Sequence, residues 1–367
     1  MKEQIRQILS DGQPRKAREL AVALSIETTS VNQFLYRNLD TFTKNADHRW
    51  TLASLSELVV EFPDTEWLEC DHFEDALSAV ESPLESSAPI VVLRLQPDTK
   101  VMLDAIARFL ALCNQLVVAG KTVVLDFSGC KNTSSYLDRL GFYEHLKPEV
   151  EVLPQRPSKS RAAAYRGQSS RLVELAAISV DEPDEDIPDR LHQVLEQQYE
   201  NNAPVGLHTI LTELFSNVHE HSQSKLPGFA ALQLYKGRKP HIRTVFSDSG
   251  KGILATIKPA LTKTLRTELG AETDDMTPDL GIALIERLFT QGGISRFRKG
   301  GRGLGLRNTG RFADKFAGSI TVRQDTYEVT IHFGGDEHEF AARTGLNKLE
   351  GTHICVKFEL TRWLKPH

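Results

Sequence analysis

The sequence predicts a multidomain α/β protein in which three folded parts are separated by two connecting segments. Short helical patterns fill residues 1–52, and a β-α-β pattern occupies residues 90–127. Residues 200–360 contain an amphipathic helix followed by strands and glycine-rich runs. A chain of 367 residues usually forms two or three domains, so the length agrees with this partition.

The first part, residues 1–55, has the layout of a winged helix-turn-helix. Turn residues separate three short amphipathic runs, and a polar turn followed by Trp50 predicts a hairpin, which would be the wing. The third helix of such a unit commonly reads nucleic acid. The helices are expected at residues 2–9, 15–24 and 29–39.

Asn32 and Tyr36, one turn apart, together with Trp50 resemble the Zα type of winged helix, which recognises left-handed duplexes. The resemblance implies that Asn32 and Tyr36 face the nucleic-acid backbone and that Trp50 braces the tyrosine. Residues 1–52 carry eight Lys or Arg against six Asp or Glu, which offers little charge for phosphate contact. Duplex nucleic acid and a regulatory protein are therefore both expected partners.

Residues 56–88 are expected to form an acidic linker with one short helix. No Lys or Arg occurs from Glu57 to Leu93, whereas Asp and Glu accumulate between Glu61 and Glu85. Such a run would repel a phosphate backbone, and a solvated spacer is its simplest interpretation.

Residues 89–150 are expected to form a small α/β module. Two β-branched runs, at residues 90–95 and 122–127, flank a helical run at residues 102–119. This order predicts a β-α-β unit.

The run Asp126-Phe127-Ser128-Gly129, with Ser134 and Ser135 near the start of the next helix, resembles the sulfate-transporter and anti-sigma-antagonist (STAS) domain. In that family a serine at this helix start is phosphorylated, and here either Ser134 or Ser135 would match. N-capping is the simpler role for both hydroxyls. After this module, residues 151–188 are rich in Pro, Arg and then acidic residues, which predicts a connector to a last domain at residues 189–367.

The last domain contains a carboxylate and an amide four residues apart on one helix. Apolar residues recur at three-and-four spacing through residues 207–221, so Glu213 and Asn217 share one helical face. An amide oxygen suits a hard Mg²⁺ ion, and a nearby carboxylate can deprotonate a water that attacks a phosphate.

Two glycine-rich runs accompany that helix. Asp248 ends a predicted strand, and Gly250 and Gly252 allow backbone to approach a ligand closely. A buried aspartate at this position can accept a hydrogen bond from an exocyclic amine such as that of adenine. Before a helical run at residues 306–316, a second glycine-rich run presents backbone N–H groups, and an arginine, to phosphate. Its members are Gly301, Arg302, Gly303 and Gly305.

Together, these runs resemble the superfamily of ATP-binding domains shared by gyrase, heat-shock chaperones, histidine kinases and mismatch-repair ATPases (GHKL). The resemblance covers about residues 200–360 and implies an α/β sandwich with a mixed sheet, holding ATP and Mg²⁺. It implies Glu213 as the general base, Asn217 as the Mg²⁺ ligand and Asp248 as the adenine reader. Thr352 would help to hold adenine through water, and the other ATP-binding positions would be Gly250, Gly252, Gly301, Arg302, Gly303 and Gly305.

The superfamily contains both hydrolases and protein kinases, so the reaction stays open. The leading hypothesis is a slow ATPase whose nucleotide state gates contact with nucleic acid or a partner protein, in regulation or defence. An anti-sigma-factor-type serine protein kinase and a non-hydrolysing nucleotide-gated interaction module are the alternatives. A histidine kinase is disfavoured, since no histidine has the context of a phosphoacceptor helix. The resemblance also implies a possible homodimer.

Bulk composition sets further limits. The net charge of −5 argues against a general nucleic-acid binder, although local basic patches are compatible with it. Four scattered cysteines have no metal-like spacing, and the sequence has neither a signal peptide nor an apolar stretch of membrane-spanning length. A reduced, cytoplasmic protein without a membrane partner is therefore expected.

Overall fold

The computed structural model divides the chain into two compact units. The first is Met1–Glu57 with Ala88–Ile90, and the second is Leu58–Ser87 with Val91–His367. The residues that the structure describes are 1–9, 13–39, 41–52, 57–179, 184–197, 207–221, 224–236, 239–270, 275–290, 318–333 and 338–359.

The first unit contains three helices and an antiparallel hairpin, in the expected order. The Asn45 side chain closes the hairpin turn, because its Oδ1 accepts the backbone N–H groups of Asp47 and Arg49 at 3.1 and 2.9 Å. Trp50 lies in the core with apolar residues from all three helices. The elements are α1 (Lys2–Leu9), α2 (Ala17–Leu24), α3 (Thr28–Arg37), β1 (Phe42–Lys44) and β2 (Trp50–Leu52).

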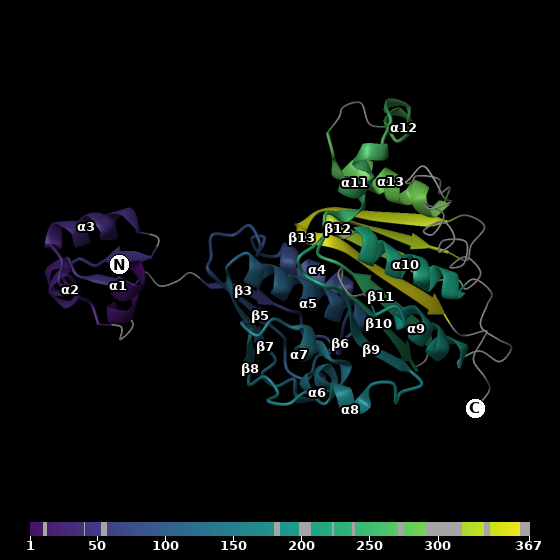
Figure 1. Ribbon diagram of the computed structural model, residues 1–367, viewed down its shortest axis with the longest axis horizontal. Helices are drawn as coiled ribbons and strands as arrows, with labels where there is room; N and C mark the ends of the chain where they lie inside the picture. The colour runs from purple at the N-terminus through teal and green to yellow at the C-terminus, as the bar shows by residue number, and fades with distance from the viewer. Residues whose placement is uncertain are drawn as a thin grey trace. The chain divides into compact units, whose positions relative to one another are not determined.

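The second unit is built on a five-stranded sheet of order β12-β13-β11-β10-β9 (Figure 1). Each neighbouring pair is antiparallel, so the expectation of a mixed sheet is wrong for these strands. The pairs β10-β11 and β12-β13 join strands that follow one another in the chain and turn back on themselves, which makes them antiparallel. The strands are β9 (Leu172–Ile178), β10 (Gly228–Tyr235), β11 (His241–Ser247), β12 (Ser319–His332) and β13 (Glu339–Glu359).

Strand β12 is a single strand over Ser319–His332, although its sequence has the pattern of two strands, at residues 319–323 and 328–333. Its pairing with β13 shifts register around Asp325, which has a left-handed φ of 42°. The irregularity explains why the sequence has the pattern of two strands, since a bulge interrupts the alternation of side chains without ending the ladder.

Helices cover both faces of the five-stranded sheet (Figure 1). On one face, α9, α10 and α13 enclose an apolar core with the strands. On the other, α4, α5 and α6 pack against the sheet. These helices are α4 (Cys70–Ser78), α5 (Leu103–Val118), α6 (Lys131–Leu140), α9 (Ile187–Glu196), α10 (Leu207–His221) and α13 (Pro278–Thr290).

Beyond α5 lies a second sheet of order β3-β5-β7-β8, in which β7 and β8 are parallel. The short strands β4 and β6 form a separate parallel pair. The strands are β3 (Glu57–Glu61), β4 (Trp67–Leu68), β5 (Ile90–Arg94), β6 (Lys100–Val101), β7 (Thr122–Asp126) and β8 (Glu151–Leu153). The remaining short helices are α7 (Phe142–His145), α8 (Ala162–Tyr165), α11 (Gly252–Ile257), η1 (Lys258–Ala260) and α12 (Lys263–Glu268).

Two segments expected to connect domains contribute to this fold. Residues 56–88 supply β3, β4 and α4, and Phe73 and Leu77 of α4 are fully buried. Residues 151–188 supply β8 and the edge strand β9. Both segments carry charged residues whose partners lie elsewhere in the chain. Their composition alone therefore resembles that of a solvated spacer, although both are part of the fold.

Helix α5 is buried on nearly all sides between the two sheets. Fourteen of its sixteen residues are buried, including the charged Asp104 and Arg108. A helix that is apolar around its whole circumference belongs in a core. Its two charges therefore need partners inside the protein.

Those partners come from α4 and from the five-stranded sheet. Arg108 contacts Glu74 of α4 at 2.6 Å and also pairs with Glu328 of β12. Glu74 is shared with Arg323 of β12, at 3.1 Å. All four side chains are at most 3% exposed, so the network ties α4, α5 and β12 together.

A second buried pair joins α5 to β11. Arg243 contacts Asp104 at 2.6 Å and Glu69 at 2.8 Å. Burial is the largest single influence on the pKa of Asp104 and raises it, but Arg243, a hydrogen bond with Cys70 and Arg108 together lower the pKa below its usual value. Within the described part of the chain, no helix is both long and apolar enough to cross a bilayer.

We expect Arg243→Met to destabilise the second unit by about 3–5 kcal/mol, because it leaves the Asp104 carboxylate buried without its closest cation. Arg94→Met is the matched control: Arg94 pairs with Glu61 and Asp126 but is 44% exposed. It should cost at most about 1 kcal/mol. Urea unfolding of both variants measures the difference, and equal losses would contradict the importance of the buried pair.

Candidate functional site

The turn after β11 is held by the aspartate that opens it. Asp248 is only 5% exposed, and its Oδ1 accepts the backbone N–H of Gly250 at 2.7 Å. This side-chain turn lets the chain leave the sheet and start α11 at Gly252, which has a left-handed φ of 77°. Asp248, Gly250 and Gly252 therefore lie together in the turn that follows β11.

The same turn lies against a glycine of β13 that is distant in sequence. The backbone N–H of Asp248 donates to the Thr352 carbonyl at 2.9 Å. Gly351 has a φ of 96°, and a Cβ there would lie 1.9 Å from the Asp248 carbonyl oxygen. Only glycine allows this approach, so Gly351 sets the position of Thr352 beside Asp248.

Gln324 links three parts of this site. Its Nε2 donates to the Thr352 hydroxyl at 2.8 Å. Its Oε1 accepts the backbone N–H of Ile253 at 3.2 Å and the hydroxyl of Tyr327 at 3.1 Å. The Thr352 side chain and the start of α11 are thus held by one buried amide from the β12 bulge.

Burial raises the pKa of Asp248 to about 6 from 3.8, and hydrogen bonds from Gly250 and Thr352 oppose the rise. Because the pKa is higher in the folded state, ionisation of Asp248 lowers stability as pH increases from 3.8 to about 6. A ligand amine that donates to the ionised carboxylate would offset that desolvation cost.

Helix α10 carries Glu213 and Asn217. Its Leu214 and Phe215 pack into the apolar core. Glu213 and Asn217 are half-buried and lie about one turn apart on the same helix. The next residue, Val218, lies against Gly228 so closely that a Cβ on Gly228 would be 2.2 Å from Val218 and 3.1 Å from the Ser247 carbonyl. The helix thus approaches the strand end from which Asp248 projects.

The predicted site residues are not all hydrogen-bonded to this turn. Among the described residues, no hydrogen bond joins Glu213 or Asn217 to Asp248. The glycine-rich run of Gly301, Arg302, Gly303 and Gly305 lies outside the described residues, so its expected role stays a prediction. No group of His, Cys, Asp and Glu in the described ranges is arranged to hold a metal.

A cavity of about 660 Å³ adjoins the turn. It is lined by Ser249–Gly252 and Gly351 on one side and by Gln115 of α5 on another, while Asp248, Glu213 and Asn217 do not line it. Its volume lies in the range of small-molecule sites. Its wall has more cationic than acidic side chains, which favours an anionic ligand: Lys225, Lys251, Lys258 and Lys348 against Asp325 and Glu350.

Gln115, like Gln324, is a residue of the site that sequence reasoning missed. It is 3% exposed, and its Nε2 donates to the Ser249 hydroxyl and to the Glu350 carbonyl, both at 2.9 Å. Its Oε1 accepts the Glu350 backbone N–H at 3.0 Å. The amide therefore fixes both the Asp248 turn and the approach to Gly351. A lone glutamine in an apolar helical run gives no sequence signal of this role.

In the first unit, the expected aromatic contact is present. Tyr36 is 53% exposed, and its ring meets the ring of the buried Trp50 edge-on, with centroids 5.1 Å apart. Lys44 donates to the Tyr36 hydroxyl at 2.9 Å and adds a cation beside both rings. Asn32 is half-buried one turn earlier on α3.

We expect Gly351→Ala to destabilise the second unit by more than about 3 kcal/mol, because it combines backbone strain with a clash against Asp248. Gly345→Ala is the control: Gly345 also has a positive φ, of 68°, but a Cβ there meets nothing within 4 Å. It should cost about 1 kcal/mol. Thermal unfolding compares the two, and a similar loss for both would refute the close approach.

Comparison with known proteins identifies the region around this site. Residues 202–362 match the family described as Histidine kinase-, DNA gyrase B-, and HSP90-like ATPase (HATPase_c). No curated protein and no solved structure matches the chain. The matched span includes α10, the Asp248 turn and Gly351-Thr352. Residues 202–362 are therefore a GHKL-type ATPase domain.

Proposed function

We propose that this chain binds Mg-ATP and hydrolyses it slowly, and that its nucleotide state gates contact with nucleic acid or a partner protein. The observation that carries the proposal is the contact between the Asp248 turn and Gly351-Thr352 inside the matched family span. Two segments far apart in sequence meet there around a buried carboxylate, beside a cavity with a lysine-rich wall.

In this proposal, Asp248 accepts a hydrogen bond from the adenine amine, and the Thr352 hydroxyl helps to hold adenine through a bridging water. Asn217 supplies an amide oxygen to Mg²⁺, which would neutralise charge on the phosphates when bound. Glu213, one turn earlier, accepts a proton from the attacking water. Gly250 and Gly252 let the backbone approach the nucleotide closely. Phosphate contacts are assigned to Gly301, Arg302, Gly303 and Gly305.

An anti-sigma-factor-type serine protein kinase is one alternative, and a non-hydrolysing nucleotide-gated module is another. The STAS-like arrangement favours the kinase: Ser135 Oγ accepts a hydrogen bond from Arg161 at 3.0 Å, and an arginine would also hold a phosphate. Incubation with γ-labelled ATP separates these functions. Free labelled phosphate supports the ATPase, label on serine supports the kinase, and binding without turnover supports the gated module.

We propose that the first unit is a winged helix whose exposed Tyr36, braced by Trp50, contacts a partner together with Asn32. Duplex nucleic acid is the leading partner because Lys44 adds a cation beside the tyrosine. A regulatory protein is the alternative. ATP-dependent homodimerisation would bring two such units together. Adding DNA or RNA duplexes to the labelled-ATP assay tests whether the two activities are coupled.

We expect Glu213→Ala to lower the rate of ATP hydrolysis by about 10²–10⁴-fold, because the attacking water loses its base. ATP affinity should remain unchanged, since the carboxylate acts on water and not on the nucleotide. Asn217→Ala should instead weaken Mg²⁺-dependent binding. Glu196→Ala, a half-exposed acid on the neighbouring α9, is the control and should leave both properties intact. Unchanged hydrolysis in the Glu213 variant would remove it as the base.

We expect Gln115→Leu to weaken ATP binding about tenfold. The variant loses the hydrogen bonds that fix the Asp248 turn, each of which is worth about 1 kcal/mol. Asn114→Leu is a matched control on the same helix: Asn114 is equally buried but bonds His145 and Lys147, away from the turn. Calorimetric titration with ATP measures both. Equal weakening would mean that general destabilisation, and not positioning by Gln115, causes the loss.

A further inference from the structure

A chain of buried hydrogen bonds leads from the β12 bulge to the carboxylate of Asp248. The Tyr327 hydroxyl donates to Gln324 Oε1 at 3.1 Å, and Gln324 Nε2 donates to the Thr352 hydroxyl at 2.8 Å. All three of these residues are buried. Water therefore competes little for these bonds, and the polar groups must satisfy one another.

Helix α13 holds the first member of this chain in place. Gly281 of that helix lies so close to Tyr327 that a Cβ on the glycine would be 2.2 Å from the phenolic oxygen. Glycine within a helix costs about 1 kcal/mol relative to alanine, and here its bare backbone makes room for the tyrosine. The tyrosine follows the register shift at Asp325, so the bulge and the helix together direct its hydroxyl to Gln324.

The orientation of the Gln324 amide follows from its neighbours. Its Oε1 accepts the backbone N–H of Ile253 at 3.2 Å as well as the Tyr327 hydroxyl. A backbone N–H can only donate, so the end of the amide that faces Ile253 must be the oxygen. The nitrogen then faces Thr352, and it can only donate to the threonine hydroxyl.

That orientation decides what the Thr352 hydroxyl does. A hydroxyl has one proton, and because the oxygen accepts from Gln324, the proton remains free to donate elsewhere. Asp248 is the acceptor: burial raises the pKa of its carboxyl, whereas hydrogen bonds from Gly250 and from the backbone and side chain of Thr352 lower that pKa. The threonine proton thus favours the ionised carboxylate, which accepts hydrogen bonds and cannot donate one.

We propose that Gln324 is a positioning residue that determines which purine the nucleotide site accepts. By holding the Thr352 hydroxyl as a donor to Asp248, it keeps the carboxylate an acceptor, which selects a base with an exocyclic amine. A base with a carbonyl at the same position would place two acceptors together without a proton between them, and buried groups left unpaired in this way weaken binding. The inference rests on the proposed function, in which Asp248 reads the base.

The test compares ATP with inosine triphosphate, in which a carbonyl replaces the amine of adenine. Calorimetric titration of the full chain with Mg²⁺ present should show that ATP binds at least about tenfold more tightly. Gln324→Met has a similar size but no amide, so it frees the Thr352 hydroxyl to turn away from Asp248. The ratio of the two affinities should then fall to about threefold or less. A general loosening of the site weakens both nucleotides and leaves the ratio unchanged.

Gln324→Glu is a second variant with the size of the original side chain. Its carboxylate keeps the bonds from Ile253 and Tyr327 but accepts the threonine proton where the amide donates. It should lower the ratio at least as far as Gln324→Met does, and it keeps the test decisive if the methionine variant does not fold. In a chain that already carries Thr352→Val, which has no hydroxyl, Gln324→Met should not change the ratio further. A merely structural role of Gln324 would instead leave the two effects additive.

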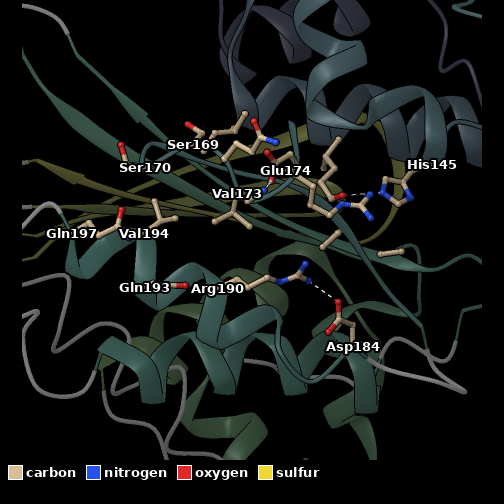
Figure 2. A pocket seen from close by; sticks show the side chains of 17 residues that line it. His145, Ser169, Ser170, Val173, Glu174, Asp184, Arg190, Gln193, Val194 and Gln197 are labelled. Atoms are coloured by element: carbon tan, nitrogen blue, oxygen red, sulfur yellow. Dashed lines mark hydrogen bonds and ion pairs between the residues drawn. The ribbon is translucent and has the colours of Figure 1, made fainter. Parts of the chain in front are cut away.

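Two other glutamines provide matched controls. Gln233 of β10 also accepts a hydrogen bond from a tyrosine hydroxyl, that of Tyr136. Gln193 of α9 lines a cavity, as Gln324 does, but a different one, which Figure 2 shows. In the described part of the chain, neither side chain is hydrogen-bonded to Thr352. Gln233→Met and Gln193→Met should therefore keep the affinity ratio of the unaltered chain.

The outcomes separate the role of Gln324 from the function on which it rests. An unaltered chain that binds neither nucleotide would overturn both. An unaltered chain that binds ATP and inosine triphosphate equally, or that prefers ATP by the same ratio as both Gln324 variants, would overturn only the role of Gln324. A similar fall of the ratio in the two control variants would do so as well, because the fall would not depend on the bond to Thr352.

Discussion

Helix α5 is enclosed by two sheets, so each of its charges must be neutralised by a group from another layer. Arg108 and Asp104 find those groups on α4, β11 and β12, and all of the pairs are nearly free of solvent. Leaving either side unpaired would bury an uncompensated charge, which costs far more than an exposed pair contributes. The parallel-stranded module and the ATPase sheet are consequently one unit, in which neither layer can keep its buried charges without the other.

The same helix extends that dependence to the candidate site. About two turns beyond Arg108, Gln115 bonds Ser249 and both backbone groups of Glu350. These residues flank the two segments that meet at Asp248 and Gly351. Because α5 is fixed by its ion pairs, a displacement of the module would move the turn, and a displacement of the turn would strain the module. Helix α5 and the buried amide of Gln115 therefore connect the sheet that contains β7 and β8 to the proposed nucleotide site.

Local patterns predicted the parts of the site that depend on neighbouring residues. The apolar spacing of α10, the strand before Asp248 and the glycines after it are properties of short segments, and they are found where expected. The layer that supports them was not predictable in the same way. Glu74 meets Arg323 across most of the chain, so residues 56–88 have the composition of an acidic spacer until their partners are known. The apolar run of β9 was hidden in the same manner among flanking charges, and Gln115 had no local pattern at all.

The carboxylates buried in this unit differ in how they are compensated. Glu74 and Asp104 each have one oxygen without a hydrogen bond, but the other oxygen of each contacts an arginine. Their negative charge is thus neutralised within the fold, and the unpaired oxygen is a minor cost. Glu174 has only a long contact to a backbone N–H, on a strand that is bulged at that residue and open at the sheet edge. A fold that matches its interior charges so closely elsewhere would gain nothing structural from this one, because leucine at the same position would fill the space without the desolvation cost. Glu174 is therefore less well compensated than Glu74 and Asp104, and its unpaired oxygen lowers the stability of the second unit.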